Sequence, residues 1–268
     1  ARVLSGLRDN LSIPRQAAGS TAQWVDETVA VPESRLGLDQ INMGPRTVGT
    51  WIPLSKKLVI QSSTSVESFV REDLATAVAT AIDKAAISGD GKGAAPRGIM
   101  GLDSKIVNPI SLGKNGGFLS YDSVVELETI LADRNADVQL QYLTNPKVRG
   151  FLKKKLEAPG VPGYIWSRGE RPGMGEVNSY PAWATNQVPS DLTKGTGKGL
   201  SVFMMGNFAD IIIGEWGTLQ VTVDPFSEAK RALINIVVHF ECDIAMRHAE
   251  SFIYYDDVKT DGSPTEEG

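Results

Sequence analysis

The chain has few of the side chains that most catalytic and metal sites need. Its 268 residues include one cysteine, Cys242, and two histidines, His239 and His248. A single cysteine excludes an intrachain disulfide and suits a reducing compartment. The two histidines are nine positions apart and lack the i,i+4 spacing of a helical metal site. We therefore expect no catalytic residue, no metal site and no cofactor.

Two glycine-rich segments contain a lysine but lack the rest of a phosphate-binding loop. Lys92 and Lys198 are each followed by glycine, whereas a P-loop has serine or threonine there to hold magnesium. No G-x-S-x-G nucleophile elbow is present. On a strand, the three-residue spacing of His239 and Cys242 would place them on opposite faces. Asp256-Asp257 and Glu266-Glu267 are interpreted as tail charges. A hydrolase or nucleotide-binding enzyme is the second alternative for function.

The chain also lacks a basic excess and a long apolar run. Its formal net charge is −5, which is not typical of a nucleic-acid-binding domain. The densest basic run, Lys153-Lys154-Lys155, is interpreted as a solvated helix face. The sequence contains no run of 18 apolar residues, so no membrane-spanning helix is predicted. The first 16 residues are polar and broken by Pro14, unlike a signal peptide. We expect no membrane partner.

The clearest predicted element is a long helix over residues 65–88. Thr64 and Glu67 match a capping box, and Gly89 is expected to end the helix in a left-handed conformation. At 1.5 Å per residue the helix would be roughly 35 Å long. One face is predicted to be apolar, at Val66, Phe69, Val70, Leu74, Val78, Ile82 and Ala86.

Residues 17–55 have the composition of strands. Trp24 to Val31 and Thr47 to Ile52 are rich in β-branched and aromatic residues, on either side of the turn signal Gly44-Pro45. A two-stranded ribbon cannot bury its own faces, so it would need a partner surface. An ordinary meander within one domain is the alternative.

A second group of elements is predicted from residue 119 onward. It comprises helices over 121–131 and from Pro146 to Leu156, strands near 138–143, 180–186, 200–206 and 211–223, and a flexible loop over 190–199. The apolar runs Ala232–Val238 and Ser251–Tyr255 are expected to return to the sheet of the first domain.

Three short motifs, in this order, resemble those of the major capsid proteins of tailed bacteriophages with the Hong Kong 97 fold. They are Trp24-Val25-Asp26-Glu27, then Gly89-Asp90-Gly91 with Pro96-Arg97-Gly98-Ile99, and Gly206-Asn207-Phe208. Residues 180–186 are similar to the family's G-x-P-V strand, although Ser179 replaces the usual glycine. The resemblance covers nearly the whole chain.

The resemblance implies an α+β, Hong Kong 97-like capsid fold. The expected parts are an N-terminal arm across neighbouring subunits (1–16), an extended β-hairpin loop (17–55), a peripheral domain (56–118 and 226–258) with the spine helix 65–88, an axial domain (119–225) and a polar, disordered tail (259–268).

The implied function is structural. The chain would assemble as pentamers and hexamers into an icosahedral head that encloses double-stranded DNA without binding it specifically. It would lie in the virion, after assembly in the cytoplasm of a bacterial host. The implied partner is a portal protein, with a decoration protein and a scaffold or maturation protease as further candidates. Ala1 as the first residue favours N-terminal processing over methionine removal. An encapsulin-like compartment that packages a cargo enzyme is the first alternative.

Some family members join a lysine of the extended loop to an asparagine of a neighbour. Residues 17–55 contain no lysine, and Lys56 and Lys57 lie at the base of the loop. We therefore expect a shell without these crosslinks, held by noncovalent contacts. Candidate intersubunit residues, with Trp24 as an apolar anchor, are Trp24, Glu27, Glu33, Arg35, Arg46, Lys56 and Lys57.

Overall fold

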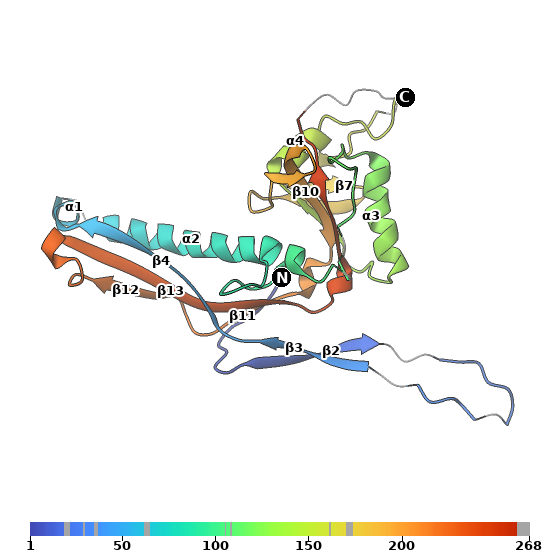
Figure 1. Cartoon of the computed structure of the whole chain (residues 1–268), viewed down its shortest axis with the longest axis horizontal. Coiled ribbons are helices and arrows are strands. Elements are labelled where there is room, and N and C mark those ends of the chain that lie inside the picture. Colours follow the sequence, from blue (N-terminus) through green and yellow to red (C-terminus); the bar gives the residue numbers. More distant parts are fainter. Residues whose placement is uncertain are drawn as a thin grey trace.

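The protein is an elongated body built on two β-sheets, with a thin hairpin that projects from it (Figure 1). The computed structural model describes residues 1–18, 22–28, 30–34, 37–61, 65–104, 106–107, 109–160, 162–169 and 174–261.

The first sheet has five strands among the described residues. Its order is β1 (Arg2–Leu4), β11 (Ile211–Glu215), β13 (Leu233–Met246) and β12 (Gln220–Asp224), and β4 (Arg46–Ser55) pairs with β13 along its other edge. The β4–β13 ladder is antiparallel and continuous from Ser55↔Leu233 to Arg46↔Cys242. Only β1 runs parallel to its neighbour, β11. This sheet is therefore assembled from three distant parts of the chain.

The long helix α2 (Ser65–Ser88) lies along this sheet and has the predicted bounds (Figure 1). Val70, Leu74 and Val78 are buried against the sheet, where they meet Leu54 and other apolar side chains of β4 and β13. Thr64, half of the expected capping box, lies outside the described residues. The placement of Phe69 on the buried face was wrong: 70% of this residue is exposed. A short helix, α1 (Lys56–Gln61), joins β4 to α2.

Gly89 ends α2, but not for the predicted reason. It is not among the glycines with positive φ, whereas Gly91 is, at 69°. A Cβ added at Gly89 would lie 2.3 Å from the carbonyl oxygen of Pro96. A Cβ added at Gly98 would lie 2.3 Å from the carbonyl oxygen of Ala85. Glycine is required here because the helix end and the following loop pack backbone to backbone. The loop leads into the 3-10 helix η1 (Ile99–Gly101).

The second sheet has seven strands among the described residues. Its order is β14 (Phe252–Val258), β10 (Gly197–Gly206), β5 (Gln141–Thr144), β8 (Tyr180–Ala184), β7 (Met174–Val177) and β6 (Ser167–Arg168), with β9 (Leu192–Lys194) also paired to β10. Tyr142 and Phe203 stack in its core with their ring centroids 5.1 Å apart. Residues 190–199 thus contain a β9–β10 hairpin and are not simply a flexible loop.

Two helices complete this part of the molecule, and both begin with a side-chain cap. Ser120 caps α3 (Tyr121–Asp133) by accepting a hydrogen bond from the Ser123 amide. Asn145 caps α4 (Pro146–Leu152) by accepting one from the Val148 amide at 3.0 Å. α4 is shorter than predicted. The remaining 3-10 helices are η2 (Phe208–Asp210), η3 (Ala229–Arg231) and η4 (Ala249–Ser251).

The projecting hairpin consists of β2 (Leu11–Ala18) and β3 (Gly37–Met43). Its first strand begins at Leu11, so residues 11–16 are not part of a free arm, and β1 is held in the first sheet. The expected strand from Trp24 to Val31 is absent from the described residues of that range, which lie in the connection between β2 and β3. The expected strand 47–52 exists within β4, but it pairs with β13.

Two further strand assignments were wrong, for one physical reason. β11 and β12 belong to the first sheet, and β14 belongs to the second. The chain crosses between the sheets three times, after β4, after β10 and after β13, and an apolar run does not indicate which sheet will receive it. The division into peripheral and axial domains stays a prediction.

Candidate intersubunit surfaces

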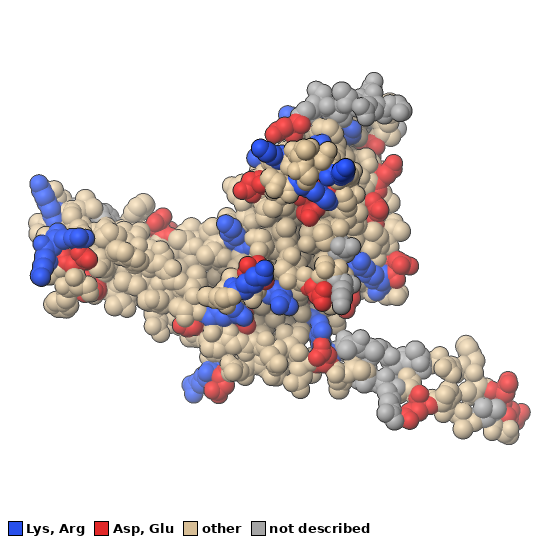
Figure 2. Space-filling model, viewed as in Figure 1, with Lys and Arg blue, Asp and Glu red and all other residues tan. Residues whose placement is uncertain are grey.

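The connection between β2 and β3 carries exposed apolar and acidic side chains. We call its described residues, 22–28 and 30–34, the loop tip. Trp24 is fully exposed and Val31 is mostly exposed. Asp26, Glu27 and Glu33 are the charged residues of the loop tip, which has no lysine or arginine among those described. Figure 2 shows acidic side chains along the outer part of the projecting connection, up to its far end.

A second surface lies at the opposite end of the molecule. Ile60 and Phe226 are both 82% exposed there, and Trp51 and Phe69 are more than half exposed. Single exposed apolar residues are normal, but a group of large ones marks an interaction surface. Figure 2 shows a cluster of basic side chains at this end. The lysines and arginines of α1 and η3 are Lys56, Lys57, Lys230 and Arg231.

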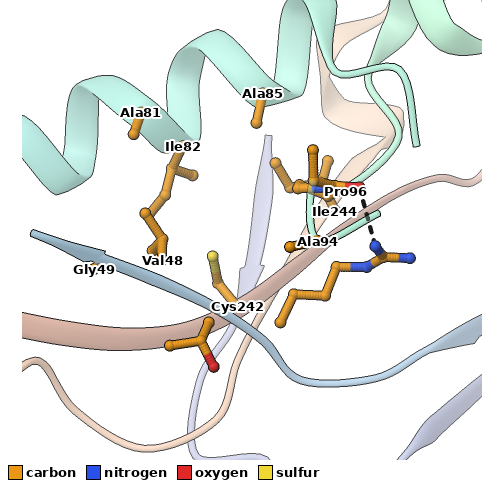
Figure 3. Close-up of a pocket in the computed structure, with 12 residues that line it drawn as sticks. Val48, Gly49, Ala81, Ile82, Ala85, Ala94, Pro96, Cys242 and Ile244 are labelled. Atoms are coloured by element: carbon orange, nitrogen blue, oxygen red, sulfur yellow. Dashed lines mark hydrogen bonds between the residues drawn. The ribbon is translucent and has the colours of Figure 1, made fainter. Parts of the chain in front are cut away.

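A third feature is a cavity beside α2, which we call the spine cavity (Figure 3). It has a volume of about 350 Å³ and lies between the helix, β4, β13 and the loop after α2. Its lining is mainly apolar and includes Ala81, Ala85, Val48 and Ile244. Cys242 also lines it but is only 4% exposed, and burial raises the pKa of its thiol to about 11. A thiol in this state is not a nucleophile near neutral pH.

Arg46 lies at the rim of the spine cavity and is held within its own chain. Its Nη1 donates hydrogen bonds to the carbonyl oxygens of Gly93, at 3.1 Å, and Ala95, at 3.0 Å. Its Nε lies 3.2 Å from Oδ1 of Asp243, whose side chain is 9% exposed. The guanidinium therefore ties β4 to both β13 and the loop after α2. Its predicted role between subunits stays a prediction.

A polar cleft of about 330 Å³ shares Arg46 and Ile244 with the spine cavity. Arg15 and Arg97 also line it. Arg15 Nη2 lies 2.7 Å from Oδ2 of Asp39, and this hydrogen bond, with one from the Gln40 amide, lowers the pKa of that carboxyl. Three guanidinium groups thus surround one cleft next to the spine cavity.

The candidates from sequence fall on different parts of the molecule. Trp24, Glu27 and Glu33 lie together on the loop tip, whereas Lys56 and Lys57 open α1 at the opposite end (Figure 1). Arg35 lies outside the described residues. Within one chain the candidates on the loop tip do not meet those on α1. An ion pair between the loop tip and α1 would therefore join separate copies.

The sequence reasoning missed an ion pair in which the carboxylate is buried and the lysine is partly exposed. Lys194 Nζ lies 2.8 Å from Oδ2 of Asp257, a carboxylate with no exposed surface, and 3.0 Å from Oγ of Ser111. Asp257 also accepts hydrogen bonds from Ser111 Oγ and the Leu112 amide. Burial lowers the pKa of Lys194, but Asp257 and Asp256 outweigh it and the pKa is raised. Asp257 is thus part of β14, not a tail charge.

Conventional sites are not visible in the described part of the chain. It has no group of three or more His, Cys, Asp or Glu residues that could hold a metal ion. None of its helices combines the length and apolar character that a bilayer-spanning segment needs.

The sequence profile of the phage capsid family matches residues 1–257. A major capsid protein of Halomonas phage phiHAP-1 is 30% identical over 253 residues, which cover 94% of this chain and 38% of that protein. The major capsid protein of Klebsiella oxytoca phage phiKO2 is 26% identical over 270 residues, covering 91% and 59%. The chain spans less than two thirds of the length of either relative.

Solved structures share the fold. The capsid of a native GTA particle, computed with C5 symmetry, superposes with a TM-score of 0.77 at 19% identity, over 97% of this chain and 88% of that one. A chain of Microbacterium phage Oxtober96 gives a TM-score of 0.71 at 17% identity, over 95% and 88%. These likenesses confirm the predicted α+β, Hong Kong 97-like fold.

Proposed function

Since this chain belongs to the phage capsid family, we propose that it forms the wall of an icosahedral phage head by self-assembly into pentamers and hexamers. Its named relatives are structural major capsid proteins, and the family is not one of enzymes. The alternatives of a hydrolase, a nucleotide-binding enzyme or an encapsulin-like compartment are therefore disfavoured.

The observation that carries the proposal is the projecting hairpin. The inner part of the hairpin packs on the first sheet, where Leu11, Ile13 and Ile41 lie against a cluster of Met43, Ile212 and Trp216. Among the described residues, however, β2 and β3 pair only with each other, and their connection carries the exposed Trp24 and Val31. An extended connection of this kind buries too little apolar surface to be stable alone in water. A neighbouring copy would supply the missing surface, and repetition around a closed shell would add many such contacts. Trp24, Glu27 and Glu33 are the residues that we expect in these contacts.

The finer assignments follow from the same proposal. The sheet with β5, β8 and β10 would form the axial domain, and the sheet with α2 the peripheral domain. The shell would enclose double-stranded DNA without specific contacts, in keeping with a net charge of −5. Partners would be a portal protein, a decoration protein, and a scaffold or maturation protease. The assembled shell would be part of the virion and would form in the cytoplasm of the bacterial host.

The shell would be stabilised without lysine–asparagine crosslinks. Residues 17–55 have no lysine, and Lys56 and Lys57 lie on α1, at the end of the molecule opposite the loop tip. Denaturing electrophoresis of assembled particles should show the monomer alone. A ladder of covalent multimers would contradict this part of the proposal.

Negative-stain electron microscopy of the expressed chain, with absorbance at 260 and 280 nm on the same particles, tests the main proposal. Closed angular shells, or rings of five and six copies, are expected. Shells filled with a copurified enzyme in place of nucleic acid would favour the encapsulin-like compartment. A chain that stays monomeric alone and with its scaffold would refute self-assembly.

A further inference from the structure

We infer that Trp24 of one copy inserts into the spine cavity of a neighbouring copy, where Arg46 holds its indole ring. This inference rests on the proposed function, because it names the surface that receives the loop tip. It concerns a contact between two copies of this chain.

Trp24 has the properties of an inserted anchor. Its relative exposure is 105%, so no described residue of its own chain covers it. The connection that carries it extends away from both sheets (Figure 1), and the spine cavity lies beside α2. Trp24 therefore does not fill the cavity of its own chain. Buried tryptophans dominate the energetics of protein interfaces, since they bury a large apolar area at a small cost in side-chain entropy.

The spine cavity has the properties of a receiving site. Its wall on α2 consists of Ala81, Ile82 and Ala85, and alanine side chains leave space between the helix and the sheet (Figure 3). Its volume of about 350 Å³ lies within the ~300–1,000 Å³ of sites that hold small organic groups. The cavity is open to solvent, so an inserted ring would remove its apolar lining and the indole surface from water together.

The charges around the two surfaces are complementary. Asp26 and Glu27 lie two and three residues after Trp24 in the sequence. Arg46 lies at the rim of the cavity, and Arg97 lines the adjoining polar cleft. The carbonyls of Gly93 and Ala95 and the carboxylate of Asp243 fix the Arg46 guanidinium, so little side-chain entropy would be lost when an indole ring stacks on it. Asp243 offsets the charge of Arg46, so this arginine would contribute mainly by stacking. A tryptophan followed by two acids thus meets an apolar cavity beside arginines.

A photo-crosslinker tests where the residue at position 24 lies. The full chain carries p-benzoylphenylalanine in place of Trp24, and copies with light and heavy nitrogen are mixed before assembly and irradiation. Mass spectrometry should find mixed-isotope crosslinks between the peptide around position 24 and peptides that contain Val48, Ala81 or Pro96. Crosslinks from position 24 to any other surface, or crosslinks within one copy only, would overturn the inference.

The same crosslinker in place of Trp183 is the matched control. Trp183 is 41% exposed on β8, away from the loop tip, and should not crosslink to the spine cavity. Crosslinks from both positions to the cavity would indicate unspecific contact and would also overturn the inference.

Filling the cavity tests its role in assembly. Ala81 is exposed on α2, so Ala81→Phe should fold and occupy the space. It should raise the concentration needed for assembly about tenfold or more, and Trp24→Ala should do the same, because the loss of a hot-spot contact has an effect of this size. The double variant should be no worse than either single one, because both remove the same contact.

Ala79→Phe is the control for bulk, because Ala79 is exposed on α2 but does not line the cavity. It should assemble normally. Additive effects of Trp24→Ala and Ala81→Phe, or normal assembly of either, would refute the inference while leaving the proposed function intact. Failure of the unaltered chain to assemble at all would refute both.

Discussion

Lys194→Met should destabilise the part of the protein that contains β9, β10 and β14. Lys194 on β9 bonds to Asp257 at the end of β14 and to Ser111 in a preceding loop. The carboxylate of Asp257 has no exposed surface, so the substitution would leave a buried negative charge without its cation. Methionine keeps the length of the aliphatic stem, so the change isolates the charge.

The magnitude follows from the surroundings of the pair. Removing one partner of a buried ion pair typically costs about 3–5 kcal/mol. Lys194 is one-third exposed, and Asp257 keeps its hydrogen bonds from Ser111 Oγ and the Leu112 amide. We therefore expect a loss of about 2–3 kcal/mol in the free energy of unfolding, since two donors still solvate the carboxylate. For a chain of this size the corresponding fall in Tm is roughly 5–10 °C.

Urea denaturation followed by circular dichroism measures the loss, with Lys198→Met as the control. Lys198 is exposed and belongs to the same hairpin, so its replacement should change the stability by less than about 0.5 kcal/mol. The double variant Lys194→Met, Asp257→Asn should recover part of the loss, because it removes the uncompensated charge. Equal effects of Lys194→Met and Lys198→Met, or no recovery in the double variant, would refute this reasoning.

Other measurements test the packing and the titrating groups. Gly89→Ala should lower the free energy of unfolding by more than about 2 kcal/mol in urea, since its Cβ would lie 2.3 Å from a backbone oxygen. Gly150→Ala, which meets open space within α4, should raise that free energy by about 0.5–1 kcal/mol, and a loss would contradict this. Cys242, whose pKa is raised to about 11 by burial, should resist a thiol reagent at pH 8 until guanidinium unfolds the chain. Asp39, whose pKa is lowered from 3.8 by Arg15, should stabilise the fold above that value and lose its contribution as the pH falls through its folded-state pKa. An NMR titration should show a higher pKa for Asp39 in Arg15→Ala, and an unchanged pKa would count against the ion pair.

Local patterns predicted the helices well. The bounds of α2 agree because apolar residues recur with the helical period up to a glycine. α4 begins where Asn145 and Pro146 predicted, since a side-chain cap and a first-turn proline act within a few residues. These features depend on neighbouring residues, which a sequence displays directly.

The candidate intersubunit residues were predictable only in part. Trp24, Glu27 and Glu33 do lie on an exposed loop, because charged residues and an isolated aromatic between strands suggest a surface. Arg46 has the same appearance in sequence but makes contacts within its own chain. Nothing in the sequence separates the two cases, because the partners of Arg46 are 47 to 197 residues away.

The sequence by itself determined the α+β class, the long helix and the lack of a lysine in residues 17–55, since these are properties of composition and short-range order. Tertiary structure alone decided that β14 joins β10, that β11 and β12 join β13, and that Asp257 is buried. It also decided where the spine cavity lies. Strand pairing, the burial of a charge and the shape of a cavity all depend on which distant segments pack together, and a local pattern does not specify that choice.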